Sequence, residues 1–97
     1  MNVQNFKVIE KFARNHADSR PSLDSWYKIT RNVIWRNFAD VRMTFNSADI
    51  YKCCVIFDIG GNKYRLIAYI DYEIQTISIV EVLTHADYDK DKWKRHC

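Results

Sequence analysis

The spacing of apolar residues changes from a helical period to a strand period near Tyr51, and this change constrains the fold more than any other feature. Before it, apolar residues recur every three or four positions, as on one face of an amphipathic helix. After it, β-branched and aromatic residues dominate, and turn residues interrupt them. Helices followed by consecutive strands predict an α+β domain, in which two N-terminal helices pack on a small antiparallel sheet.

Two helices are predicted before the change. The first carries Phe6, Ile9 and Ala13 on one face, and the polar segment 15–21, which ends in proline, should terminate it. Ser22 is placed to cap the second helix. The apolar stripe of that helix comprises Leu23, Trp26, Tyr27, Val33 and Ile34. Residues 35–46 show no clear period, so we expect irregular structure there with room for one more helical turn.

Three strands are predicted after the change, at residues 52–59, 63–71 and 76–83. Gly60-Gly61 or Gly61-Asn62 suits a two-residue turn with positive φ angles between the first two strands. Residues 72–75 should form the second reversal. Alternation along the second strand places these residues on the face that meets the helices: Tyr64, Leu66, Ala68 and Ile70. Arg65 and Lys63 should then lie on the opposite, open face.

A short helix should follow the third strand. Thr84 is a good N-cap, and Asp87 three positions later completes a capping-box pattern. Leu83 and Tyr88 are spaced as a hydrophobic staple across the start of this helix. We expect the helix to run from His85 to about residue 93.

Length and composition limit the class of protein. Ninety-seven residues make a single domain, 1–97, and a formal net charge of +3 only weakly favours an anionic partner. The three cysteines do not suggest a disulfide framework, which favours a reducing, cytoplasmic location. Neither zinc-ligand spacing, a signal peptide nor an apolar run of ~20 residues is apparent, so we expect no metal and no membrane association.

Arg65, His85 and Tyr88 are the candidate catalytic residues, because a cation, an imidazole and a phenol together suit chemistry on a phosphodiester. The guanidinium of Arg65 can stabilise the charge that grows at phosphorus, although an arginine on a strand is commonly a plain surface residue. The helix dipole favours a neutral His85, the base that a ribose 2′-hydroxyl needs, but an exposed structural histidine fits equally well. Tyr88 lies on the same helix face, where it can stack on a base or simply pack against Leu83.

Four further residues are candidates for RNA binding. Asn62 and Lys63 stand at the exit of the hairpin, and Lys90 and Lys94 are spaced to share one face of the last helix. Solvated lysines on a helix face are the ordinary alternative. The residues alone therefore favour a small basic domain that either cleaves or binds RNA.

Two runs of sequence, at this spacing and in a chain of this length, are similar to a known family. Residues 55–68 (VIFDIGGNKYRLIA) and 81–89 (EVLTHADYD) resemble the HigB toxin family, part of the RelE-like group of bacterial type II toxin–antitoxin systems. The resemblance covers most of the chain. Asp58 departs from the pattern, since asparagine is frequent there, and the Cys53-Cys54 pair is unusual.

The resemblance implies a RelE-like fold and an mRNA interferase that cleaves translated mRNA on the ribosome. It implies a metal-independent endoribonuclease without a cofactor, in which the RNA 2′-hydroxyl is the nucleophile. Arg65, His85 and Tyr88 match the family's site positions, and Asn62 and Lys63 match the flanking hairpin. A HigA-type helix-turn-helix antitoxin is the implied partner, and the basic N-terminal helices are candidates for its binding surface. A non-catalytic RNA- or ribosome-binding module remains the alternative.

Overall fold

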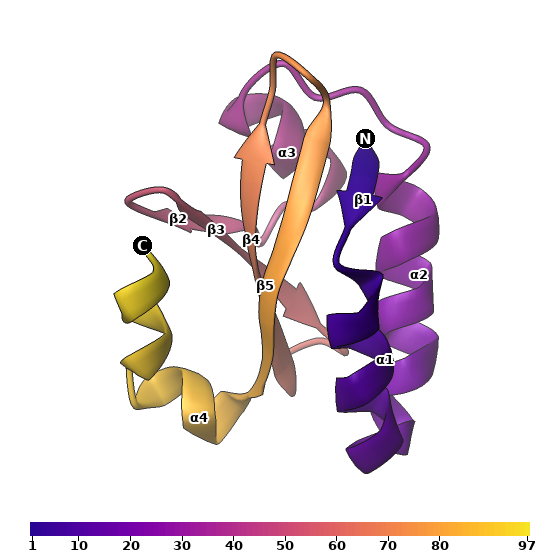
Figure 1. Cartoon of the computed structure of the whole chain (residues 1–97), viewed down its shortest axis with the longest axis vertical. Coiled ribbons are helices and arrows are strands. Elements are labelled where there is room, and N and C mark those ends of the chain that lie inside the picture. The colour runs from indigo at the N-terminus through magenta and orange to yellow at the C-terminus, as the bar shows by residue number, and fades with distance from the viewer.

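A five-stranded sheet separates the two N-terminal helices from the C-terminal residues in the computed structural model, which describes residues 1–97 (Figure 1). The strand order is β1-β5-β4-β3-β2, and all pairs are antiparallel except β1 with β5. The helices and strands are, in chain order, β1 (Asn2–Gln4), α1 (Phe6–Asn15), α2 (Arg20–Thr30), α3 (Phe38–Thr44), β2 (Asp49–Tyr51), β3 (Cys54–Ile59), β4 (Tyr64–Asp71), β5 (Thr76–Thr84) and α4 (His85–Asp89). The predicted α+β class is confirmed.

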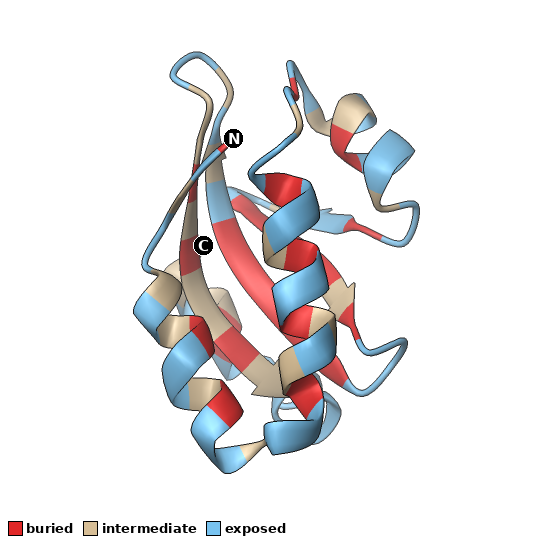
Figure 2. Cartoon of the chain, turned by 90° about the vertical axis from the view of Figure 1, so that its right-hand side faces the viewer, coloured by how far each residue is buried: buried red, intermediate tan, exposed pale blue.

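The main core lies between the sheet and helices α1 and α2, which cover one face side by side (Figure 2). The aromatic ring of Phe57 lies at its centre, 5.4 Å from the rings of both Trp26 and Phe45 and fully buried. As predicted, Tyr64, Leu66 and Ala68 face this core from β4. Their burial fixes the register of β4, because a one-residue shift would turn every apolar side chain to the other face.

A β-bulge in β5 was not predicted. The pairing of β4 with β5 shifts between Ile67 and Ala68, so that Ile79 and Glu81 pair with neighbouring residues of β4. The extra residue changes the alternation of β5, which allows both Ile79 and Val82 to reach the main core. It also sets the register in which the end of β5 lies beside the start of β4.

Several predicted helix boundaries are wrong. The second helix begins at Arg20, so Ser22 lies inside it rather than at its cap, and Pro21 occupies its first turn. It ends at Thr30, and Ile34 is therefore 79% exposed instead of continuing the apolar stripe. Residues 38–44, expected to be largely irregular, form α3, which Asn37 caps by accepting a hydrogen bond from the Asp40 amide.

The three-stranded meander is confirmed, but a further strand precedes it, its first strand is shorter and its first turn is longer. A turn at Lys52, which has a φ of 52°, separates the unpredicted β2 from β3, which begins at Cys54 rather than at residue 52. The hairpin connection spans residues 60–63, so β4 begins at Tyr64. Gly60 and Gly61 both have positive φ angles, as expected for the residues that reverse the chain.

The second face of the sheet is not open, contrary to the prediction. The C-terminal segment, defined here as residues 85–97, folds back across it (Figure 1). Trp93 is 3% exposed and packs with Cys54, Ile56 and Ile67 in a second, smaller core. The predicted helix over 85–93 is interrupted, because α4 ends at Asp89 and Asp91 has a φ of 62° before a 3₁₀ turn at Lys92–His96.

A disulfide joins Cys54 on β3 to Cys97, although the three cysteines were not expected to form a disulfide framework. Cys53 is unpaired and exposed. Sequence spacing did not indicate the bond, because the two partners are 43 residues apart and meet only when the C-terminal segment returns to the sheet. None of the helices combines the length and the apolar character that a membrane crossing requires.

Candidate functional site

Arg65 lies at the start of β4 on the face covered by the C-terminal segment, and it is buried rather than open to solvent. Its partner across the hairpin is Asp58, since the two residues pair directly in the register of β3 and β4. Arg65 Nε lies 3.1 Å from Asp58 Oδ1. The ion pair compensates a guanidinium whose side chain is only 9% exposed.

Each of the five N–H groups of Arg65 has an acceptor. Nε faces Asp58, and Nη1 donates to the carbonyl oxygens of Asn62 and Tyr64, each at 3.1 Å. Nη2 donates to Asn62 Oδ1 at 2.6 Å and faces His85 Nδ1 at 3.3 Å. A guanidinium carries five N–H groups in a rigid plane. Arg65 therefore has no unused donor while these contacts persist.

His85 opens α4, where the capping hydroxyl of Thr84 accepts a hydrogen bond from the Asp87 amide. The backbone N–H of His85 donates to the Lys63 carbonyl at 3.0 Å, which fixes the start of the helix against the hairpin. The His85 ring lies between Arg65 at Nδ1 and Asp89, whose Oδ2 is 3.2 Å from Nε2.

These contacts select one tautomer of His85. Arg65 can only donate, so His85 Nδ1 must accept and therefore carries no proton. The proton then lies on Nε2, where it is donated to Asp89. The side chain of His85 is 48% exposed, so the imidazole is accessible to a ligand while the guanidinium beneath it is not.

Tyr88 completes the cluster through its ring. The Arg65 guanidinium lies 5.1 Å from the centre of the Tyr88 ring, within the range of a cation–π contact. Trp93 stacks on Tyr88 with ring centres 5.1 Å apart, and its indole N–H donates to the Tyr88 carbonyl. Burial, followed by the charge of Asp49, raises the pKa of Tyr88 above its usual value, so the hydroxyl stays protonated at neutral pH.

Arg65, His85, Tyr88 and Asn62 thus form one contiguous group, whereas Lys63 does not join it. The Lys63 ammonium points to the helix side, where it lies 2.8 Å from Asp18. Asp18 also accepts a hydrogen bond from the Tyr64 hydroxyl at 2.7 Å. The bond from Lys63, and then that from Tyr64, lower the pKa of Asp18, and the same bond to Asp18 raises the pKa of Lys63.

The chain matches the model of the HigB toxin family, described as a RelE-like toxic component of a toxin–antitoxin system, over residues 19–91. The chain belongs to the HigB toxin family. A protein of Escherichia coli O6:H1 named mRNA interferase HigB is 27% identical over 93 residues, which cover 93% of this chain and 90% of the relative. The mRNA interferase toxin HigB of Escherichia coli K12 is 27% identical over 89 residues, which cover 84% and 86% respectively.

Lys90 and Lys94 lie on the C-terminal segment of this toxin, but not on one continuous helix. Lys90 is 3.4 Å from Asp87, and Lys94 is 3.4 Å from Asp91 and 4.8 Å from the centre of the Tyr51 ring. Both ion pairs are largely solvated, so they leave the ammonium groups available to an anionic ligand.

Three residues that support the site were not recognised in the sequence. Asp58 could have been found from the hairpin register, which places it opposite Arg65. Asp89 lies four residues after His85 and hence on the same helix face. Trp93 gave no such signal, because its stacking on Tyr88 depends on the break at Asp91.

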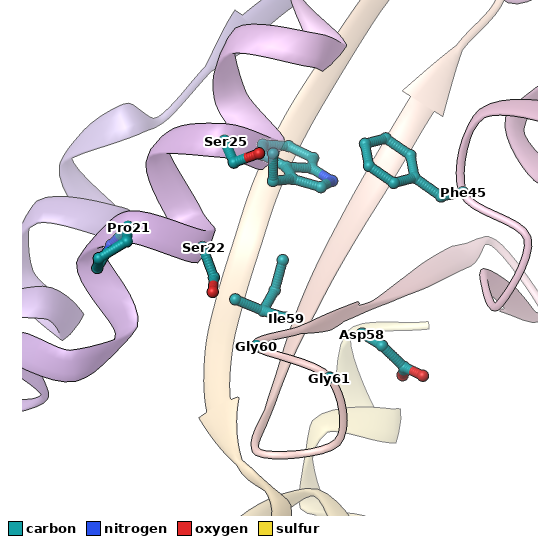
Figure 3. A pocket seen from close by; sticks show the side chains of 9 residues that line it. Pro21, Ser22, Ser25, Phe45, Asp58, Ile59, Gly60 and Gly61 are labelled. Atoms are coloured by element: carbon teal, nitrogen blue, oxygen red, sulfur yellow. The ribbon is translucent and has the colours of Figure 1, made fainter.

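A hollow lies beside the hairpin, between its glycines and helix α2 (Figure 3). Ser22 and Ser25 of α2, Ile59 and Phe45 border it, and Asp58 reaches it from β3. In Figure 3 the Asp58 carboxylate points away from the serines. The hollow therefore adjoins the site through Asp58 alone and contains neither His85 nor Tyr88. No three His, Cys, Asp or Glu side chains are grouped as metal ligands.

Proposed function

We propose that this toxin is an mRNA interferase, a metal-independent endoribonuclease that cleaves translated mRNA on the ribosome in the cytoplasm. The observation that supports the proposal best is the convergence of Arg65, His85 and Tyr88 in one partly exposed cluster. The names of its relatives in Escherichia coli point the same way. The three side chains provide a cation, a neutral imidazole and a protonated phenol, the groups that general acid–base cleavage of RNA requires.

In the proposed reaction, the ribose 2′-hydroxyl attacks the adjacent phosphorus, and the 5′-oxygen leaves. His85 accepts the proton of the 2′-hydroxyl at Nδ1, and Asp89, which already contacts Nε2, stabilises the imidazolium that forms. The charge that develops on the phosphate oxygens faces Arg65. Tyr88 keeps its proton at neutral pH and is suited to donate it to the leaving oxygen.

Substrate binding must rearrange the bonds of Arg65 for this reaction to proceed. In the structure, His85 Nδ1 is occupied by Arg65 Nη2, so the base is masked. A phosphate oxygen that takes over this Nη2 donor would free the lone pair of Nδ1 for the 2′-hydroxyl. The 3.3 Å contact between the two side chains is longer than the 2.6 Å bond to Asn62, which makes it the easier one to exchange.

His85→Ala is the sharpest test, because His85 is half exposed and its removal should not disturb the core. We expect cleavage of translated mRNA, mapped by primer extension in a purified translation reaction, to fall by roughly 100-fold or more. Arg42→Ala removes an exposed cation from α3 and serves as the matched control. Full cleavage by folded His85→Ala protein would reject the proposed base, and absence of cleavage by the wild type would reject the nuclease.

A non-catalytic RNA- or ribosome-binding module is the second candidate, and the saturated hydrogen bonding of Arg65 favours it. A purely structural arginine would have this same set of partners. In this case the wild type would bind ribosomes without cutting mRNA, and His85→Ala and Tyr88→Ala would weaken binding only. Sedimentation with ribosomes, measured beside primer extension, separates the two functions.

We also propose a HigA-type antitoxin as the neutralising partner. A groove of about 390 Å³ between α1 and β5 is bordered by Val8, Phe12 and Val82, with Lys11 on its rim. Lys7 and Arg14 extend the basic rim along α1. Four of the eight residues that line the groove are apolar, while Glu81 borders its β5 side. The basic side formed by α1 suits an amphipathic segment that carries acidic residues. Lys7→Glu combined with Lys11→Glu should weaken antitoxin binding in calorimetry without altering mRNA cleavage.

A further inference from the structure

The three cysteines of the chain meet at one place, although two of them are far from the third in sequence. Cys54 and Cys97 are bonded, with Cα atoms 5.5 Å apart. The unpaired Sγ of Cys53 lies 3.4 Å from the backbone oxygen of Cys97. A free thiol thus lies beside the backbone of a disulfide-bonded cysteine, and exchange requires its sulfur to reach the Cys97 sulfur.

The three sulfur atoms differ in access to solvent. Cys54 is fully buried beneath Trp93, Cys97 is half-buried, and Cys53 is exposed. An entering thiolate can therefore reach the sulfur of Cys97 and not that of Cys54. Cys53 is the cysteine most accessible to disulfides in solution, such as oxidised glutathione.

The disulfide is connected to the candidate site by a short series of contacts. Cys97 closes the 3₁₀ turn that carries Trp93, and its backbone N–H donates to the Lys94 carbonyl at 3.0 Å. Trp93 stacks on Tyr88 and donates its indole N–H to the Tyr88 carbonyl. Tyr88 in turn lies against the Arg65 guanidinium.

The end of the C-terminal segment, after Trp93, has few contacts besides the disulfide. They include the hydrogen bond from the Tyr69 hydroxyl to the His96 carbonyl, the contacts of the Cys53 thiol with the His96 and Cys97 oxygens, the Lys94 ammonium over the Tyr51 ring and a 3.9 Å contact between His96 and Glu81. The buried cluster on this face has four residues, against sixteen on the helix face. Opening the disulfide should therefore loosen Trp93, and with it the ring that packs on Arg65.

We propose that Cys53, Cys54 and Cys97 form a thiol–disulfide exchange site for low-molecular-weight thiols and disulfides, and that the closed Cys54–Cys97 bond keeps the RNA-cleaving cluster assembled. The role of the disulfide in assembling that cluster rests on the proposed nuclease function. A reducing cytoplasm would keep the bond open, so the assembled state should form when the thiol pool becomes oxidised.

The reaction balances with glutathione as the co-reactant. In opening, a glutathione thiolate attacks the Cys97 sulfur, and Cys54 leaves as a thiolate that takes up a proton. A second glutathione attacks the glutathione sulfur of this mixed disulfide, which releases Cys97 as a thiol and yields oxidised glutathione. Two electrons pass from two glutathiones to the protein. Alternatively, the Cys53 thiolate displaces glutathione from Cys97, which forms a Cys53–Cys97 bond without further reduction.

The first experiment compares the full-length toxin equilibrated with oxidised or reduced glutathione. Intact-mass measurement after acid quenching should show the Cys54–Cys97 bond only in the oxidised sample. Hydrogen exchange of residues 85–97 should be several-fold faster in the reduced sample, and mRNA cleavage should be at least about tenfold slower, because small displacements of catalytic groups are costly. A segment equally protected in both states would overturn the proposal.

Variants separate the exchange site from the nuclease. Cys97→Ser should behave like the reduced wild type under all conditions, and Cys53→Ser should keep the bond and full cleavage but respond to glutathione several-fold more slowly. Cleavage by Cys97→Ser equal to that of the oxidised wild type would overturn the link between bond and site. If neither the wild type nor the variants cleave mRNA, the proposed nuclease function is rejected. The mass and hydrogen-exchange measurements still test the role of the disulfide.

Discussion

The helix-covered face of the sheet buries a cluster of sixteen residues, whereas the face under the C-terminal segment buries four and carries the charged cluster around Arg65. On the first face, aromatic rings pack around Phe57 without a buried charge among them. On the second, a guanidinium is held by hydrogen bonds, an ion pair and one aromatic ring. The comparison indicates that the helix face supplies most of the stability, and that the other face uses part of it to place polar groups.

The largest expected effect comes from the centre of the helix face. Phe57→Ala should lower the free energy of unfolding by about 3–5 kcal/mol, because it removes a fully buried ring among three others. Urea denaturation followed by tryptophan fluorescence would measure the change. Ile34→Ala, at a side chain 79% exposed, should change it by less than about 0.5 kcal/mol. Equal effects of the two substitutions would mean that Phe57 is not central to stability.

On the opposite face, where the buried cluster is small, the Cys54–Cys97 disulfide adds stability. Cys97→Ser should lower the free energy of unfolding of the oxidised protein by about 2–4 kcal/mol, because the bond closes a loop with a sequence separation of 43. In excess reductant, the variant and the wild type should unfold at nearly the same urea concentration. A loss that persists under reduction would indicate that Cys97 acts through packing.

The ion pair beneath the site should have a smaller effect. Asp58→Ala leaves the Nε of a nearly buried Arg65 without its acceptor, which should cost about 1–3 kcal/mol. Asp24→Ala breaks a solvated pair with Arg20 and should cost no more than about 0.5 kcal/mol. Thermal unfolding of both variants tests the difference. Similar midpoints would show that the buried Arg65 does not require Asp58 as an acceptor.

The smallest effect concerns the ion pair between Asp18, just before α2, and Lys63 in the hairpin turn. The bonds from Lys63 and Tyr64 lower the pKa of Asp18 below its ordinary 3.8. Its contribution is therefore present above about pH 3.8 and is lost as pH falls through the lower folded-state value. Asp18→Asn should be less stable than the wild type at neutral pH, and the difference should shrink in acid. Urea midpoints of both proteins, measured from pH 6 down to pH 2.5, test this expectation. A difference in stability that stays constant over this range would contradict it.

The sequence was sufficient for the elements whose pattern is local. The strand β4, the cap at Thr84 and the positive φ angles at Gly60 follow from alternation, capping and turn chemistry within a few residues. The grouping of Arg65 with His85 and Tyr88 also followed, because a meander brings the start of β4 beside the end of β5. Whether these three residues carry catalysis stays a prediction.

What could not be predicted depends on distant partners. Arg65 is buried because residues 85–97 return over the sheet, and the break at Asp91 that directs them has no strong sequence signal. The opposite orientation of Lys63 arises because it belongs to the turn rather than to β4, and Asp18 attracts it from 45 residues away. The short strand β1 has too few residues to show any period.

The pairing of β1 with β5 has a consequence for the order in which this chain folds. Asn2 pairs with Thr76, so β1 can join the sheet only after at least 76 of the 97 residues have been synthesised. Contacts between residues so far apart raise the contact order, which slows folding relative to a helical protein of equal length. A ribosome releasing this toxin would therefore release a chain whose helices can form early but whose sheet edge, where β1 pairs with β5, assembles last.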